Sequence, residues 1–427
     1  MTGIRAAPRG IILGGMSLLG QRMFPWVAGC GLVLALSSCG PAAPATGGME
    51  KTAAAAPMWT ARVGGPVYAV PQVQGGKLYV TTTQGKGDNV YALDLMRGTT
   101  AWKAATGGAI GIPPTVNGNF LFIASDVGSV HYLRAFDRRT GRLLWAYTRN
   151  KAPQCMCSHP SQVGGGLVFA LTDGHSLYAF EPQKGKRVWR FPGDGAKLTP
   201  PVVVGGTVVF GSQDHRVYGL DAATGEVRWI QTTGYAFDAA PRVYRGLVVL
   251  GNRGGTVHAY RAADGHPVWS FATGGAITAP VAVRPGTVFV SSADRQVYAV
   301  DAVSGKKRWS AAMADASPYA PVPSGSLVLA ASQDGHLYAF RAADGQRAWR
   351  RDLGGTPTSA PVPSGGVVYQ RVGDHAVAAV RMATGRVLWV YRTSAVLTAP
   401  AAARGMAFVG TSTGEVLALM GPGKMAS

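Results

Sequence analysis

Gly219-Leu-Asp-Ala-Ala-Thr-Gly-Glu-Val-Arg-Trp229 is one copy of a motif that recurs along most of the chain. Toward the C-terminus its Trp returns every 40 residues, and toward the N-terminus every 40 to 44. The ladder is Trp59, Trp102, Trp145, Trp189, Trp229, Trp269, Trp309, Trp349 and Trp389. From Trp102 onward, a Gly stands four residues before each Trp. Such phasing indicates a repeat protein.

One period reads as four short strands. In residues 229–269, apolar or alternating runs at 238–243, 246–251, 256–260 and 268–271 are separated by Gly, Asp and Asn. Runs of this length and spacing are typical of antiparallel hairpins. No stretch has a sustained 3.6-residue period, so helices are absent or minor. The sequence therefore predicts an all-β protein, a single β-propeller of four-stranded antiparallel blades.

The number of blades follows from the repeats. We count nine Trp strands and nine sets of the other three strands, with eight blades as the alternative. The chain begins with a lone Trp strand at 57–63 and ends with three strands at 397–419. These two ends are expected to share one blade and to close the ring.

The repeat resembles the tryptophan-docking motif of quinoprotein-type (PQQ-like) propellers. The copies Gly219 to Trp229, Ala135 to Trp145 and Ala299 to Trp309 carry the resemblance, each with Asp, Thr or Ser, Gly and Trp in register. It covers residues 59 to about 420. It implies that the nine Trp of the ladder pack between neighbouring blades, and that a Thr-Gly corner joins the third strand to the fourth. Eight blades are usual in that family.

The N-terminal region is predicted to direct export. Residues 1–38 hold three Arg, no acid and an apolar stretch, as in a signal peptide. Leu36-Ser37-Ser38-Cys39 resembles a bacterial lipobox, which implies lipidation of Cys39, and Gly40 favours the outer membrane facing the periplasm. The alternatives are an ordinary cleaved signal or a retained anchor, and the start is Met1 or Met16.

These boundaries divide the chain into four parts. The signal peptide covers 1–38, a lipidated Pro- and Ala-rich flexible tether 39–57, the propeller 58–420 and a C-terminal tail 421–427.

The charge is strongly basic. There are 41 Lys and Arg against 21 Asp and Glu, a formal +20. Basic residues at or beside the corners between third and fourth strands suggest a face for an anionic partner: Lys186, Arg187, Lys306, Lys307, Arg308, Arg350 and Arg351. The alternative is that Arg is frequent because the genome is GC-rich. Nucleic acid is not an expected partner of an exported lipoprotein.

One segment breaks the repeat. Residues 152–160 contain Cys155, Cys157 and His159, which include both cysteines outside the signal. Three interpretations stay open: a disulfide or idle thiols, a redox role, or a copper or zinc site.

Two functions of different classes remain. The lipobox, tether and PQQ-like repeats resemble the BamB family of outer-membrane assembly lipoproteins. This implies a protein-binding scaffold with an envelope partner such as a barrel-assembly component, monomeric outside its complex, with no catalytic residue and no cofactor.

The alternative is a quinone- or metal-dependent redox protein using PQQ and calcium. Against that alternative, Met156 separates the two Cys that stand adjacent in such enzymes. A third, less specific interpretation is an envelope propeller that binds sugar or peptide.

Overall fold

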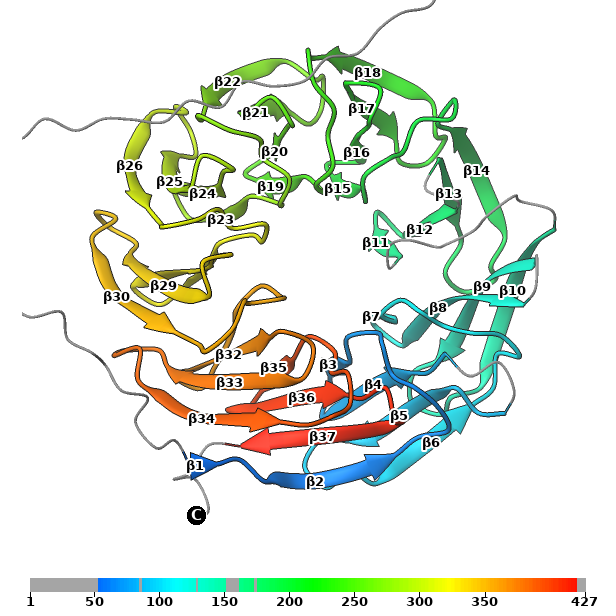
Figure 1. Cartoon of the computed structure of the whole chain (residues 1–427). Coiled ribbons are helices and arrows are strands. Elements are labelled where there is room, and N and C mark those ends of the chain that lie inside the picture. Colours follow the sequence, from blue (N-terminus) through cyan, green and yellow to red (C-terminus); the bar gives the residue numbers. More distant parts are fainter. Residues whose placement is uncertain (1–52, 84–86, 128–129, 151–160, 173–174, 421–427) are drawn as a thin grey trace, which may run out of the picture. The chain divides into compact units, whose positions relative to one another are not determined.

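A computed structural model describes residues 53–83, 87–127, 130–150, 161–172 and 175–420. Within these ranges every regular element is a strand, and the strands form nine sheets around a ring (Figure 1). No helix in this part of the chain is long and apolar enough to cross a membrane. The prediction of an all-β propeller with antiparallel four-stranded blades is confirmed, with nine blades rather than eight.

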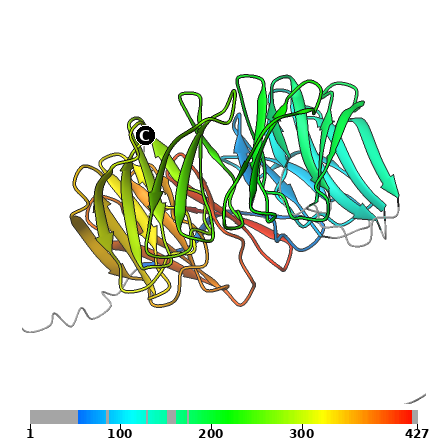
Figure 2. The same ribbon diagram turned by 90° about the horizontal axis from the view of Figure 1, so that it is seen from above.

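Each blade runs from a short strand near the ring centre to a strand at the rim, as Figure 1 shows, and Figure 2 shows the same ring turned by 90°. We number the blades along the chain from the first complete one. Blades 1 to 3 contain β3 (Gln72–Gln74), β4 (Lys77–Thr81), β5 (Val90–Asp94), β6 (Thr100–Ala104), β7 (Thr115–Asn117), β8 (Phe120–Val127), β9 (Val130–Asp137), β10 (Leu143–Asn150), β11 (Gln162–Gly164), β12 (Leu167–Thr172), β13 (Ser176–Phe180) and β14 (Arg187–Pro192). Blades 4 to 6 contain β15 (Val202–Val204), β16 (Thr207–Gly211), β17 (Arg216–Asp221), β18 (Val227–Thr232), β19 (Arg242–Tyr244), β20 (Leu247–Gly251), β21 (Thr256–Arg261), β22 (Pro267–Ala272), β23 (Ala282–Arg284), β24 (Thr287–Ser291), β25 (Gln296–Asp301) and β26 (Lys307–Ala312). Blades 7 and 8 contain β27 (Val322–Ser324), β28 (Leu327–Ala331), β29 (His336–Arg341), β30 (Arg347–Asp352), β31 (Val362–Ser364), β32 (Val367–Val372), β33 (Ala376–Arg381) and β34 (Val387–Arg392).

Blade 9 is built from both ends of the chain. Its inner strands are β35 (Ala401–Ala403), β36 (Met406–Gly410) and β37 (Glu415–Met420), and its rim strand is β2 (Pro57–Arg62). β2 pairs antiparallel with β37, with Trp59 opposite Ala418. The predicted closure of the ring by shared terminal strands is confirmed.

The core lies between blades rather than inside one sheet. The described residues form nine clusters of buried apolar side chains, and each cluster combines residues of two neighbouring blades. Second and third strands supply most of them, as in β20 and β21, because both faces of these strands are covered. This explains why the second strands read as continuous apolar runs instead of alternating ones.

A tryptophan and a glycine join each blade to the next. The Trp229 indole N–H donates to the Ala262 carbonyl at 2.9 Å, and a Cβ built on Gly265 would lie only 2.6 Å from the Trp229 ring. Gly265 also has a φ of 73°, which favours glycine. Seven further junctions repeat the bond: Trp59 to Leu95, Trp102 to Arg138, Trp145 to Pro182, Trp189 to Ala222, Trp269 to Ala302, Trp309 to Ala342 and Trp349 to Met382.

The junction at Trp389 is different. Its indole N–H has no partner among the described residues, since the equivalent acceptor would fall beyond Met420. Instead the two-residue strand β1 (Ala53–Ala54) adds in parallel to β34, with Ala53 opposite Trp389. Trp389 is the most enclosed Trp of the ladder, at 0% exposure. The segment predicted as a tether to residue 57 thus contributes this strand to blade 8.

We expect Gly265→Ala to lower the free energy of unfolding by about 2–4 kcal/mol, because its methyl group would meet the Trp229 ring as well as strain the backbone. Denaturant unfolding followed by Trp fluorescence measures this loss. Gly246→Ala is the matched control, with a similar φ of 79° but no atom within 4 Å of the added Cβ. It should cost only about 1–2 kcal/mol. Equal losses in both variants would show that backbone strain, rather than the indole contact, makes the glycine necessary.

Candidate functional site

The two faces of the ring differ in charge. We define the corner face as the first–second and third–fourth strand turns, each with its bordering residues, and the opposite face as the remaining turns and connections defined in the same way. Among the described residues the corner face holds 18 Lys and Arg against eight Asp and Glu, a net +10. The opposite face holds seven against ten, a net −3. The excess positive charge of the described propeller is therefore concentrated on one face.

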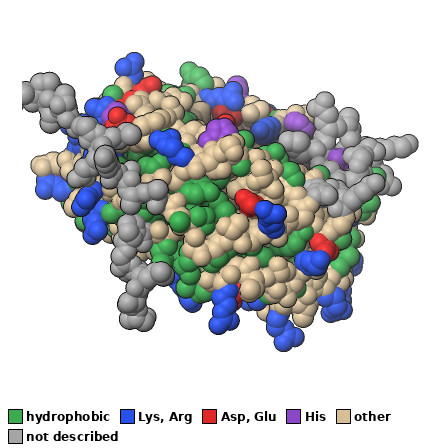
Figure 3. Space-filling view, turned by 60° about the horizontal axis from the view of Figure 1, so that its bottom comes forward, with side chains coloured by type: hydrophobic (Ala, Val, Ile, Leu, Met, Phe, Trp, Pro, Cys, Tyr) green, Lys and Arg blue, Asp and Glu red, His purple; other side chains and the backbone are tan. Residues whose placement is uncertain are grey.

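The residues predicted for an anionic partner do not all share this face. Lys186, Arg187, Lys306 and Lys307 lie on it and are exposed. Arg308 is the second residue of β26, where its guanidinium meets the Asp301 carboxylate at 2.6 Å. Figure 3 shows basic side chains projecting around the edge of the molecule.

Arg350 and Arg351 lie farther along the rim strand β30. Arg350 reaches Asp334, a residue of the opposite face, at 3.4 Å. Arg351 points the other way and donates through Nε to the Gly385 carbonyl in the corner of blade 8. Alternation along a strand places successive side chains on opposite sides, which separates this pair.

The acids of the corners are engaged within their own turns. Asp221 accepts the backbone N–H groups of Ala223 and Thr224, each at 2.8 Å, and a bond from Arg228 at 2.5 Å. These bonds lower the pKa of Asp221. The pKa of Asp301 is lowered likewise, first by Arg308 and then by the Ser304 N–H. The carboxylates thus stay ionised and bound to their turns. Two of the corner arginines, Arg261 and Arg341, pair with the corner acids Asp264 and Asp344 at 2.8 Å each.

The cysteine segment lies outside the described residues. Cys155, Cys157 and His159 fall within 151–160, so a disulfide, redox or metal role there stays a prediction. Elsewhere in the described chain no three His, Cys, Asp or Glu side chains come together as a metal site. Calcium requires six to eight oxygen ligands, and the described residues bring together no group of three carboxylates that could contribute to such a set.

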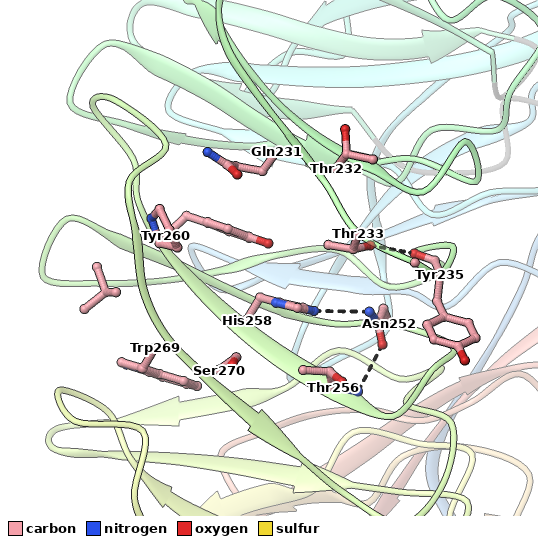
Figure 4. Close-up of a pocket in the computed structure, with 13 residues that line it drawn as sticks. Gln231, Thr232, Thr233, Tyr235, Asn252, Thr256, His258, Tyr260, Trp269 and Ser270 are labelled. Atoms are coloured by element: carbon pink, nitrogen blue, oxygen red, sulfur yellow. Dashed lines mark hydrogen bonds between the residues drawn. The ribbon is translucent and has the colours of Figure 1, made fainter.

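A pocket of about 480 Å³ lies in the cleft between blades 4 and 5 (Figure 4). Gln231 and Thr232 of β18 and the following loop form one side, while β21 and β22 form the other. Its lining residues are Gln231, Thr232, Thr233, Gly234, Tyr235, Asn252, Thr256, His258, Tyr260, Pro267, Val268, Trp269 and Ser270.

Two departures from the repeat open this cleft. In the next cleft on either side an aromatic residue of the rim strand packs on a Tyr of the following third strand. Phe191 lies 5.3 Å from Tyr218, and Phe271 lies 5.5 Å from Tyr298, between ring centroids. Between blades 4 and 5 the equivalent positions hold Gln231 and His258. The smaller polar side chains leave space that the aromatic pairs fill elsewhere.

His258 is held by hydrogen bonds and burial. Its Nε2 lies 3.1 Å from Nδ2 of Asn252, whose Oδ1 accepts the Thr256 N–H at 3.0 Å. Its ring stacks on Tyr260 with an interplanar angle of 8°. Burial lowers the pKa of His258 to about 4 and raises the pKa of Tyr260 to about 12. Both side chains are therefore uncharged at neutral pH.

Sequence reasoning did not find this pocket. Gln231, His258 and Tyr260 each suit a β-strand and belong to no motif. The signal was present in the register: the third-strand position of His258 is Tyr91, Tyr178, Tyr218, Tyr298 and Tyr338 in five other blades. A comparison of the residues at this position in all blades, rather than a search for motifs, identifies blade 5 as the exception.

Four-stranded blades locked by a Trp of one blade on the glycine corner of the next define a PQQ-like β-propeller. Residues 52–192, 132–254 and 214–419 match the family described as outer membrane protein assembly factor BamB. The chain belongs to this family. No curated protein matches the chain.

Solved structures share the fold at low sequence identity. BamB from Moraxella catarrhalis is 17% identical, with a TM-score of 0.59, and the match covers 88% of this chain and all of that one. The quinohemoprotein alcohol dehydrogenase from Comamonas testosteroni is 14% identical, with a TM-score of 0.57, covering 87% and 77% of the two chains. The computationally designed Ika8 protein is 18% identical, with a TM-score of 0.56, covering 72% and 95%.

The low pKa of His258 predicts a pH dependence of stability. An unfolded His titrates near 6.5 and this one near 4, so between these values the unfolded chain binds more protons. The contribution of His258 is complete above pH 6.5 and falls, by at most about 3 kcal/mol, as the pH drops to 4. Urea unfolding at pH 7 and pH 4 should show a smaller loss for His258→Gln, which cannot titrate. The same loss in variant and wild type would place the titration elsewhere.

Proposed function

We propose that this protein is a protein-binding scaffold of the cell envelope that works in outer-membrane protein assembly. The observation that carries the proposal is the match to the BamB family across residues 52–419, the whole propeller. The net +10 on the corner face supports an acidic partner surface docking there, because long-range attraction speeds and orients association. The partner class we propose is a barrel-assembly component.

The proposal includes export and lipid attachment. A signal peptide at 1–38, lipidation of Cys39 and a tether at 39–57 would hold the propeller at the outer membrane, on its periplasmic side. A tethered scaffold meets membrane-bound partners at high effective concentration, so even a weak interface serves. Support for this part comes from the lipobox-like residues and from the family.

We expect Cys39→Ser to move the protein from the membrane fraction to the soluble periplasmic fraction, because stable anchoring at this end depends on the acyl chains. Fractionation and intact-mass measurement of the purified protein provide the readout. The matched control is Cys30→Ser, the other signal-region cysteine, which should leave the lipid mass unchanged. Loss of the acyl mass in Cys30→Ser instead would move the attachment site.

Charge reversal tests the corner face. We expect Lys306→Glu with Lys307→Glu to reduce recovery of barrel-assembly components with the full-length protein by about tenfold at low salt, because each exchange replaces an attraction by a repulsion. Quantitative mass spectrometry of the co-purified membrane proteins measures recovery.

The control for this experiment carries the same change of charge on the opposite face. Arg62→Glu with Lys197→Glu, both exposed, should recover the partner as the wild type does. Equal losses in the two double variants would assign the effect to net charge. Wild-type recovery without any barrel-assembly component would contradict the proposed function itself.

The alternative function, a quinone- or metal-dependent redox protein, has the shared fold of a quinohemoprotein dehydrogenase in its favour. That likeness concerns the propeller alone. Appearance of a bound chromophore after addition of PQQ and calcium would favour it over the scaffold.

A further inference from the structure

We propose that the pocket between blades 4 and 5 binds a neutral saccharide of one or two sugar rings. This site lies apart from the corner face and does not depend on the scaffold function. Its volume of about 480 Å³ falls within the range of about 300–1,000 Å³ that is usual for small-molecule sites. The argument rests on one hydroxyl, on the absence of charge among the lining residues and on one exposed ring.

The hydroxyl of Tyr260 is the strongest indication of a polar ligand. Tyr260 is only 4% exposed, and its hydroxyl, which lines the pocket, makes no hydrogen bond within the described residues. Figure 4 shows it directed into the space between Gln231 and His258. The equivalent third-strand position is apolar in the neighbouring blades, Leu220 in blade 4 and Val300 in blade 6. Packing therefore does not require this hydroxyl, whereas a ligand could use it as donor and acceptor.

The lining is polar but uncharged. No Lys, Arg, Asp or Glu is among the 13 residues that line the pocket, although the chain has 62 such residues. His258 is neutral at pH 7 because its pKa is about 4. Amide and hydroxyl groups remain, and those of Gln231 and Ser270 make no side-chain hydrogen bond within the described part of the chain. This set offers donors and acceptors to hydroxyl groups and no counter-charge to an ion.

Charged residues close to the pocket in sequence are paired with opposite charges. Arg261, which follows the lining residue Tyr260, lies 2.8 Å from the Asp264 carboxylate. Arg253 follows the lining residue Asn252, and Asp238 follows the loop of Tyr235. Arg253 Nε lies 2.5 Å from the Asp238 carboxylate, which also accepts from Gln213 at 3.0 Å. Neither group is left to attract an anion or a cation into the cleft.

The aromatic ring of Tyr235 completes the site. It is the most exposed Tyr of the described chain, at 57%. It lies against Gly254, where a Cβ would come within 2.1 Å of the ring. In blades 4 and 6 an Asp, Asp214 or Asp294, occupies the position of Gly254. An exposed ring beside hydroxyl and amide groups suits a sugar, whose C–H face packs on the ring while its hydroxyls bond at the edge.

The test uses the mature protein with three neutral disaccharides, maltose, lactose and N,N′-diacetylchitobiose, in saturation-transfer NMR and calorimetry. We expect at least one of them to bind. Gln231→Phe should weaken that binding by at least about tenfold, because it restores the aromatic residue that fills the next cleft on either side. Tyr260→Phe should weaken it by about fivefold through loss of one hydrogen bond.

Two controls keep the outcome decisive. Tyr298→Phe removes a third-strand hydroxyl of the next blade, at the position that His258 holds in blade 5. This hydroxyl bonds Asp294 at 2.5 Å outside the pocket, so its loss should leave the affinity unchanged within about twofold. Glucose 6-phosphate and N-acetyltyrosinamide serve as charged and peptide-like probes. Failure of every disaccharide to bind, stronger binding of either of these probes, or full binding by Gln231→Phe would each overturn the proposal.

Discussion

The contact between an indole ring and a glycine corner is the interaction on which the propeller depends. A sheet of four short strands cannot enclose its own side chains, and each blade here is covered only by its neighbours. The Trp229 ring lies on Gly265 while its N–H reaches Ala262, so one side chain fixes both the distance and the rotation between two blades. The described residues repeat this contact at eight junctions, and their apolar side chains form nine inter-blade cores instead of one central core. Stability is then close to a sum of neighbour interfaces, as in other repeat architectures.

Closure of the ring adds a constraint at a single place. The last blade has no rim strand of its own, and β2 supplies it from the other end of the chain. The Trp59 of that strand docks on the corner of blade 1, with a bond to Leu95. Trp389 faces the blade where the chain ends, and there β1 takes the covering position. The junctions of blade 9 with blades 8 and 1 therefore both involve the N-terminal segment: β2 supplies Trp59 to one, and β1 pairs with β34 beside the other.

The repeat made the fold readable from the sequence. Periodic Trp and Gly residues predicted the blades and their corners, because the two residues meet at the junctions between blades. The count of strands at the two ends of the chain predicted the terminal closure. The choice between nine and eight blades depended on whether every repeat joins the ring, which counting suggests but only the sheet topology decides. The contacts of single side chains were harder to predict from the sequence. Arg350 and Arg351 adjoin in sequence, yet strand alternation sends one toward Asp334 and the other toward Gly385. His258 and Tyr260 belong to no motif. They are recognised as exceptional only by comparison with the residues at the same positions in other blades.

A repeat fold separates structural from functional residues, and the charges illustrate how. Each corner needs an acceptor for its backbone N–H groups, and an Asp such as Asp221 or Asp301 fills that role. These acids are bound within the turns, and some nearby arginines, such as Arg261 and Arg308, pair with one of them. The corner face nevertheless keeps an excess of basic residues. Side chains in the clefts between blades are also free to vary. Trp229 and Gly265 keep blades 4 and 5 docked, so Gln231 and His258 can depart from the repeat without loosening that junction. Function in such a ring is expected where a blade differs from its neighbours while its docking pair stays intact.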